Sequence, residues 1–308
     1  MIASTLAATP TRRIRFTPMF TRGETIRYQI DTRTTTTGKT TTPIVDPEGG
    51  SSASETVSLL VRLDVLEVQP GIEGAPDQVR LSATYEKSSA RAERDAFNPQ
   101  TPSLEDQYAR LAGHSIEFTI GSNRQPTDFK GLDNILPSRP EPNPIPTWVN
   151  LLPLGSGFPR NGIVIGEKWG SERPLAGLPL ADLLWRTEST YLRNEPCTSS
   201  SVTVPGRASA ADLETCAIVL TRFEILRHGR ANSDATPEDY RRNGLRTSGT
   251  WKGSGERLDS ISIPSGLLIR STQTSTQDLD YQIVSASTGS TIHQVANVRG
   301  QSEVTFLP

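Results

Sequence analysis

Apolar and polar side chains alternate along several stretches of this chain. Ile26, Tyr28 and Ile30 form an apolar row, and the residues between them are polar. The same period of two recurs in Val57–Val65, Val79–Tyr85 and Ile116–Ile120. This period is typical of a β-strand that buries one face and exposes the other. These stretches therefore predict strands of an antiparallel sheet with one solvated face.

The second half of the chain repeats this pattern at short intervals. Its predicted strands are Trp185–Leu192, Ala217–Leu226, Leu245–Lys252, Arg257–Ile263, Leu267–Thr274, Asp280–Ser285, Ile292–Val298 and Glu303–Leu307. Turn dipeptides stand at Pro70-Gly71, Ser265-Gly266, Thr288-Gly289 and Arg299-Gly300. Such spacing favours antiparallel meanders over βαβ units. We therefore predict a mainly β fold, in which the meanders form a curved, partly closed, half-barrel-like sheet.

Few helices are predicted, and all of them are short. Ser103-Leu-Glu-Asp106 fits a capping box that begins one helix, and Gly113 ends it. Thr236–Asp239 begins a second, with proline at its first position. Pro146–Leu152 is a candidate for a third.

Proline marks the predicted division of the chain. Residues 137–146 carry five prolines and predict an extended linker, because proline does not fit a sheet interior. The linker separates a first β-meander half, residues 22–136, from a second, residues 147–308, although the two could pack as one domain. Residues 1–21 form an N-terminal segment. Thr32–Ser54, rich in Thr, Gly and Ser, predicts a long flexible hairpin loop.

The charge balance predicts neither a nucleic-acid partner nor a membrane one. The chain has 32 Lys and Arg against 34 Asp and Glu, and a formal net charge of −2. Its basic residues are scattered, so no field would attract nucleic acid or anionic lipid. It has no apolar run long enough for a transmembrane helix. Leu6-Ala7-Ala8 resembles the end of a signal peptide, which suggests that residues 1–21 hold the remnant of one.

Cys197 and Cys216 flank a segment rich in Ser, Thr, Gly and Pro, with predicted strands on both sides. Two cysteines at the base of one long loop are well placed for a disulfide that closes it. Such a bridge would indicate an oxidising, extracytoplasmic compartment, periplasmic or secreted. The alternative is two unrelated buried thiols. With no histidine nearby, the pair does not predict a zinc site.

No catalytic, metal or cofactor motif is recognisable in the sequence. His114, His228 and His293 lack the spacing of a metal-ligand pair. Gly253-Ser-Gly255 is interpreted as a β-turn, because no helix follows it to bind phosphate. Asp64 with Glu67, or Glu303 with a partner, are candidate carboxylates for a hydrolase. Solvated strand faces explain these acids better, so no catalytic residue and no cofactor is predicted.

The four tryptophans are the remaining candidates for a binding surface. Trp148, Trp169, Trp185 and Trp251 all follow the proline run. They could line a groove for a sugar or a lipid, or they could fill the gap between a sheet and its covering loops.

One run resembles a known group of proteins. Phe158-Pro-Arg-Asn-Gly-Ile-Val-Ile-Gly-Glu-Lys-Trp169 resembles a segment of uncharacterised bacterial exported proteins and lipoproteins. Gly266-Leu-Leu-Ile269, after Ser260–Ile263, resembles the strands that follow in those families. The outline is similar to that of half-barrel lipoprotein carriers of the LolA and LppX type. This resemblance implies a curved sheet with a concave apolar face, although the chain has no lipobox cysteine for a membrane anchor.

These observations lead to three functional hypotheses. The first is a non-catalytic extracytoplasmic binding or scaffold protein of the bacterial envelope, which holds an apolar or amphipathic ligand, or a partner chain, on a concave sheet face. The second is an envelope or surface protein–protein interaction module that works through exposed strand edges and the Thr-rich loop. The third is a hydrolase with loop-borne carboxylates. A deep apolar cavity would favour the first hypothesis, and a large exposed apolar patch the second.

Overall fold

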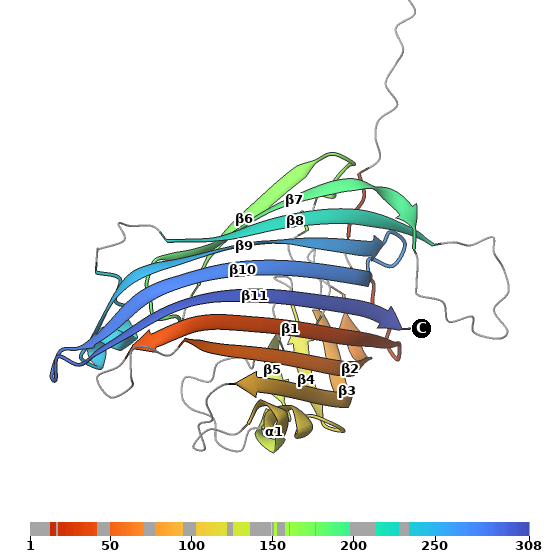
Figure 1. Ribbon diagram of the computed structural model, residues 1–308. Coiled ribbons are helices and arrows are strands. Elements are labelled where there is room, and N and C mark those ends of the chain that lie inside the picture. Colours follow the sequence, from red (N-terminus) through yellow and green to blue (C-terminus); the bar gives the residue numbers. More distant parts are fainter. Residues whose placement is uncertain are drawn as a thin grey trace, which may run out of the picture.

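The fold is a single curved antiparallel sheet. The computed structural model describes residues 13–16, 18–41, 50–70, 78–94, 103–121, 126–135, 149, 151–152, 158–159, 161–175, 177–197, 214–227 and 234–307. Eleven strands pair in the order β5-β4-β3-β2-β1-β11-β10-β9-β8-β7-β6. The sheet curls so that β3, β4 and β5 lie with α1 beneath the long central strands (Figure 1). The predicted mainly β, antiparallel, curved fold is confirmed.

Each half of the chain contributes one run of consecutive strands. The first contains β1 (Thr25–Thr41), β2 (Ser51–Gln69), β3 (Gln78–Arg94), β4 (Ser115–Ile120) and β5 (Pro126–Lys130). The second contains β6 (Lys168–Pro174), β7 (Leu183–Pro196), β8 (Thr215–Arg227), β9 (Leu245–Ser262), β10 (Leu268–Ser285) and β11 (Thr291–Leu307). The first strand pairs with the last, with Tyr28 opposite Phe306, so one sheet crosses both halves. The proline run 137–146 lies outside the described residues.

Several strands are longer than the sequence pattern predicts. The turns expected at Gly253–Gly255 and Arg299-Gly300 are wrong, because both sites lie inside the uninterrupted strands β9 and β11. The flexible loop expected over Thr32–Ser54 is also wrong over most of its length. β1 continues to Thr41 and β2 begins at Ser51, while residues 42–49 lie outside the described part. Threonine favours strands, and this preference prevails over the Gly- and Ser-rich composition.

Position 255 of β9 is a glycine because the neighbouring residues leave no room for a side chain. A β-carbon at this position would overlap the Phe223 ring and the carbonyl oxygen of Thr274. We expect Gly255→Ala to lower the free energy of unfolding by about 2 kcal/mol, since the neighbouring backbone would have to move. Urea unfolding would measure this loss.

Gly300 provides the matched control for that substitution. A β-carbon there would lie 2.7 Å from the Ser275 hydroxyl oxygen, which can rotate away. Gly300→Ala should therefore cost clearly less than Gly255→Ala. Equal losses for the two variants would contradict this explanation of the glycine in β9.

The main hydrophobic core fills the concave face of the first half of the sheet. All four predicted apolar rows are buried there, from β1 through β4. The core is covered by α1 (Leu104–Ala109), by the 3₁₀ turn η2 (Leu132–Asn134) with Ile135, and by Val149 and Leu152. The alternation in the sequence therefore predicts correctly which side of these strands faces the interior.

The helices of the described chain are short, as predicted. Ser103 caps α1 by accepting a hydrogen bond from the backbone N–H of Asp106 at 3.0 Å, which confirms the capping residue. α2 (Glu238–Arg242) begins directly after Pro237. Of the third candidate, Val149, Leu151 and Leu152 are described and form a turn. No helix in the described ranges is long and apolar enough to cross a membrane.

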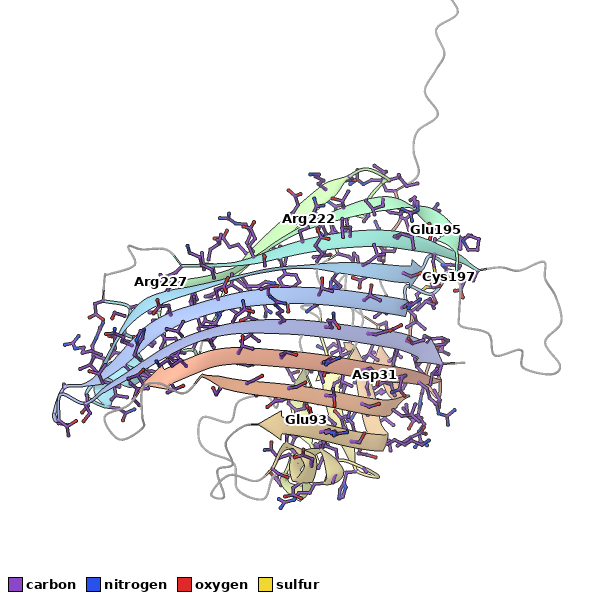
Figure 2. All side chains as sticks on the ribbon, viewed as in Figure 1. Asp31, Glu93, Glu195, Cys197, Arg222 and Arg227 are labelled. Carbon is purple, nitrogen blue, oxygen red and sulfur yellow. A yellow bond between two sulfur atoms is a disulfide. The ribbon has the colours of Figure 1, made fainter. Side chains whose placement is uncertain are left out.

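The other face of the sheet is convex and polar. Ion pairs join neighbouring strands across it, among them Arg222–Glu256 at 2.8 Å and Lys168–Glu188 at 3.0 Å. Figure 2 shows Arg222 on this outer side, among many other polar side chains. Such exposed pairs contribute about 0–1 kcal/mol each. Stability must therefore come mainly from the concave side.

An N-terminal strap, residues 13–16, closes the end of the sheet near β7. Ile14 and Ile163 pair through backbone hydrogen bonds of 2.8 Å in each direction, and Arg13 forms an ion pair with Glu167 at 2.6 Å. The backbone N–H of Val164 and the Arg13 guanidinium hold the pKa of the Glu167 carboxyl below its ordinary value. Residues of the run from Phe158 to Trp169 therefore hold this strap in place through backbone hydrogen bonds and an ion pair.

Candidate functional site

Side chains on the concave face change from large and apolar to small and mainly polar along two neighbouring strands, β1 and β11. On β1 the inward series is Tyr28, Ile30, Thr32 and Thr34. The inward residues opposite them on β11 are Phe306, Val304, Ser302 and Gly300. β10 continues the last three rows with Ser271, Gln273 and Ser275. Because side-chain volume decreases along β1 and β11 together, and no large apolar residue stands opposite on β10, space opens beside the main core.

A cavity of about 520 Å³ lies against this part of the concave face. Its sheet side comes from β1, β2, β5, β6, β9, β10 and β11, and its cover comes from residues 18, 20, 149, 151, 152 and 158. The apolar lining consists of Pro18, Phe20, Ile26, Tyr28, Ile30, Leu63, Pro126, Val149, Leu151, Leu152, Phe158, Ile261, Leu267, Leu268 and Val304. The cavity thus continues the main core rather than forming a separate chamber.

One end of the cavity is polar and contains a buried ion pair. Arg257 Nε donates to Asp259 Oδ2 at 2.9 Å, and Ser271 Oγ donates to Asp259 Oδ1 at 2.7 Å. The Asp259 side chain is 6% exposed and that of Arg257 is 38% exposed. Gln273 is the β10 partner of Arg257, and Arg173 is also among the lining residues. A buried carboxylate needs this compensation, because an unpaired charge is costly to bury.

Tyr28 adds a hydroxyl to the lining but no charge. Burial, with a smaller contribution from the Glu24 carboxylate, raises the pKa of the Tyr28 phenol well above its ordinary value. The phenol therefore stays protonated at neutral pH. Among the described residues, the charged lining consists of two guanidinium groups and one carboxylate, a net positive charge.

Three of the four tryptophans lie on the concave face. Trp169 contacts Phe158, with ring centroids 5.9 Å apart, and Trp185 stacks on Phe223 at 4.5 Å. Trp251 stacks on Tyr281 and donates from Nε1 to Gln277 at 3.0 Å. None of these three tryptophans lines the cavity. Phe158, which contacts Trp169, and Arg173, which contacts Trp185, do line it. Trp148 lies outside the described residues.

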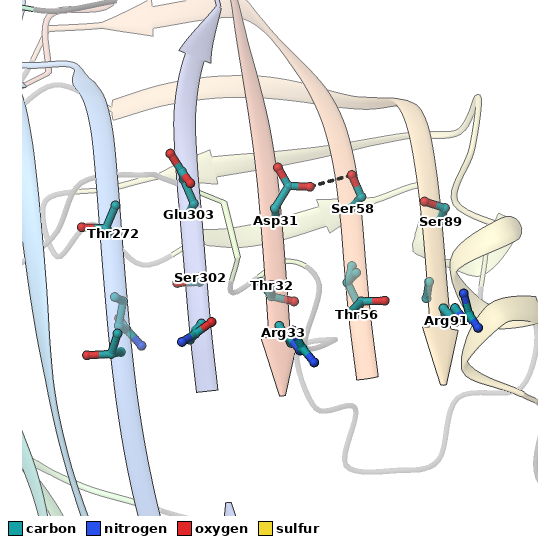
Figure 3. A pocket seen from close by; sticks show the side chains of 15 residues that line it. Asp31, Thr32, Arg33, Thr56, Ser58, Ser89, Arg91, Thr272, Ser302 and Glu303 are labelled. Carbon is teal, nitrogen blue, oxygen red and sulfur yellow. Dashed lines mark hydrogen bonds between the residues drawn. The ribbon is translucent and has the colours of Figure 1, made fainter. Parts of the chain in front are cut away.

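A polar groove of about 760 Å³ crosses the outer face of β3, β2, β1, β11 and β10. Figure 3 shows Asp31 and Glu303 side by side along it, at paired positions of β1 and β11. Asp31 accepts a hydrogen bond from Ser58 at 2.7 Å, and Glu303 forms an ion pair with Arg270 at 2.7 Å. Asp31 is therefore a second carboxylate beside Glu303. Both acids, however, already have hydrogen-bonding or ion-pair partners on a solvated face.

The other candidate acids and histidines do not meet in one site. Asp64 forms an ion pair with Arg62 at 3.0 Å, and Glu67 accepts a hydrogen bond from Gln69. His293 pairs with Asp280 at 2.8 Å, where the carboxylate is 63% exposed. His114 is exposed at the end of the α1 turn, and His228 lies outside the described part. Within the described ranges, no three His, Cys, Asp or Glu residues gather as metal ligands would.

Cys197 and Cys216 form a disulfide between the end of β7 and the start of β8, with Cα atoms 4.9 Å apart. Figure 2 places Cys197 at this end of the sheet. Cys216 is fully buried, and the Cys197 N–H donates to the Glu214 carbonyl at 2.7 Å. The bridge therefore joins two neighbouring strands and closes the connection between them.

Sequence reasoning missed the polar end of the cavity. Arg257, Asp259 and Ser271 were not singled out, because each looks like an ordinary polar residue of a strand. One signal was present. Asp259 lies two residues before Ile261 and faces the same, inward side of the strand, where an apolar residue is expected. A charged residue in the buried phase of a strand indicates a partner or a polar cavity.

Comparison with known proteins gives little further information. No protein-family model matches the chain, and no curated protein sequence matches it. A solved structure described as "Lipid-protein interactions in lipovitellin" is similar over 94% of this chain and 26% of its own, with 11% sequence identity and a TM-score of 0.46. The chain thus spans about a quarter of that protein. Nothing about the ligand of the present chain follows from so low a TM-score.

Proposed function

We propose that this protein binds an apolar or amphipathic small molecule in the concave-face cavity and acts as a non-catalytic carrier or scaffold. The observation behind the proposal is the cavity of about 520 Å³, which 15 apolar residues line together with a smaller group of polar and charged residues. Ligand sites typically measure about 300–1,000 Å³ and combine an apolar lining with a few polar groups. The outer groove lacks such an apolar wall.

The sheet edges give less support to the surface-interaction hypothesis. Both edge strands are short, and β5 carries Pro126 and Lys130 while β6 carries Lys168 and Pro174. Proline and lysine on short edges discourage pairing with another chain. The exposed large apolar side chains of the described part are scattered over the sequence, from Met19 to Val295. A single residue of this kind is ordinary on a protein surface.

We further propose that the protein works outside the cytoplasm, in the bacterial envelope or secreted. The Cys197–Cys216 disulfide is compatible with an oxidising compartment. An apolar or amphipathic ligand would also suit a carrier there, because such molecules need cover from water when they move between membranes.

A bulky side chain placed in the cavity should displace the ligand. Val304 lines the cavity from β11, and the next residue, Thr305, is on the outer face of the same strand. We expect Val304→Trp to weaken binding of N-phenyl-1-naphthylamine, an uncharged fluorescent apolar dye, by about ten-fold. Fluorescence titration would measure the dissociation constants.

Thr305→Trp is the matched control, since it adds the same indole on the opposite face. It should bind the dye as the wild-type protein does, and circular dichroism should show that both variants are folded. Absence of dye binding by the wild-type protein, or equal binding by both variants, would contradict the proposed site.

A further inference from the structure

We infer that the ligand is a single-chain amphiphile with an anionic headgroup, a carboxylate or a phosphate, which Arg257 and Arg173 bind at the polar end of the cavity. This inference rests on the proposed function and specifies its ligand. It depends on the ion pair with Asp259, on the charge of the lining, and on the order in which apolar and polar residues follow one another.

Arg257 is positioned so that it can bind a ligand while it stays paired with Asp259. Its Nε atom donates to Asp259, and within the described chain the terminal Nη groups have no hydrogen-bond partner. Asp259 is fixed in turn by Ser271, so both carboxylate oxygens are occupied on the protein side. A guanidinium group presents several donors in a rigid fork, which suits a second, bidentate contact with a carboxylate or phosphate.

Arg173, an exposed residue, supplies a second positive charge to the lining of the cavity. It lines the cavity from the edge strand β6, and its guanidinium carbon lies 5.9 Å from the centre of the Trp185 ring. No carboxylate of the described residues pairs with it. With Arg257 and Asp259 balancing one another, Arg173 carries the excess positive charge of the described lining, and this charge would attract an anionic headgroup.

The order of side chains along the strands places such a headgroup relative to its tail. Ile30 and Val304 form the apolar rows next to the core, and Thr32, Ser302 and Gln273 follow one row further along. An acyl chain would therefore lie over the apolar rows, and its headgroup would lie beside the polar row that Arg257 continues on β9. A cationic headgroup would meet like charge at this position.

Oleate and oleyl alcohol test the inference, because they share one chain and differ in headgroup charge. Each would displace N-phenyl-1-naphthylamine from the full chain, below its critical micelle concentration. We expect oleate to bind about ten-fold more tightly than the alcohol. Equal displacement by both would overturn the anionic headgroup but leave the proposed function standing. Failure of both compounds to displace the dye, or no binding of the dye itself, would overturn the proposed function.

Two variants locate the headgroup contact. Arg257→Gln combined with Asp259→Asn removes both charges and keeps hydrogen-bonding groups in place. It should lower oleate affinity about ten-fold and change that of the alcohol less than about two-fold. Arg173→Gln leaves the ion pair intact and should lower oleate affinity by a few-fold.

Arg270→Gln is the control, since Arg270 lies on the outer face of β10 and pairs with Glu303. It should leave both affinities unchanged. Parallel losses for oleate and the alcohol in the double variant would show that the ion pair only supports the fold, and would overturn the inference.

Discussion

Replacing Phe118 by alanine is expected to lower the free energy of unfolding by about 4 kcal/mol. Phe118 is fully buried on β4, and its ring packs beside Phe129 with centroids 5.9 Å apart. The substitution would remove a large side chain from the core that α1 and η2 cover, where strands on one side and short helices on the other cannot easily collapse. Urea unfolding followed by circular dichroism would measure the loss.

The neighbouring residue tests whether the loss comes from the concave core. Thr119 follows Phe118 on the same strand, and its side chain is on the outer face. Thr119→Ala should cost less than about 1 kcal/mol, because outer positions are solvated and contribute mainly through strand propensity. A comparable loss for both variants would mean that the outer face stabilises the sheet as much as the core does.

This difference between the faces is also why the first half of the fold could be predicted from sequence. Along β2 from Val57 to Val65, and along β3 from Val79 to Tyr85, apolar residues occupy the inward positions, so the period of two is clear. A shift of the strand register by one residue would expose the whole apolar row. The sequence pattern therefore predicts both that these residues form strands and which side of each strand is buried. The capping residue Ser103 was readable for a similar reason, since its chemistry is local.

The middle of β9 was harder to predict, because its inward positions are small or polar. On β9, Gly253, Gly255 and Arg257 face inward in succession, and no hydrophobic rhythm marks a strand there. Only the neighbours of these residues in the fold explain them. The Phe223 ring covers Gly255, and Asp259 forms an ion pair with Arg257. Such long-range partners cannot be identified from one sequence, so the same residues that conceal the strand also conceal the cavity.

Removal of the disulfide is expected to lower the free energy of unfolding by about 3 kcal/mol. Cys197 and Cys216 are 19 positions apart, so the bridge closes a long connection and limits the freedom of the unfolded chain. Cys197→Ser combined with Cys216→Ala would remove the bridge without burying a hydroxyl at the fully buried position 216. Urea unfolding with and without a phosphine reductant would measure the effect.

The reductant separates the bridge from the cysteine side chains themselves. Wild-type protein should lose stability when reduced and should approach the double variant, whereas the double variant should not respond to reductant. The frayed end would be that of β7 and β8, where Glu195 pairs with Cys216 and the Cys197 N–H donates to Glu214. Dye binding in the cavity should persist after reduction, because no described residue of β7 or β8 lines the cavity. Unchanged stability after complete reduction, verified by thiol titration, would refute a stabilising role for the bridge.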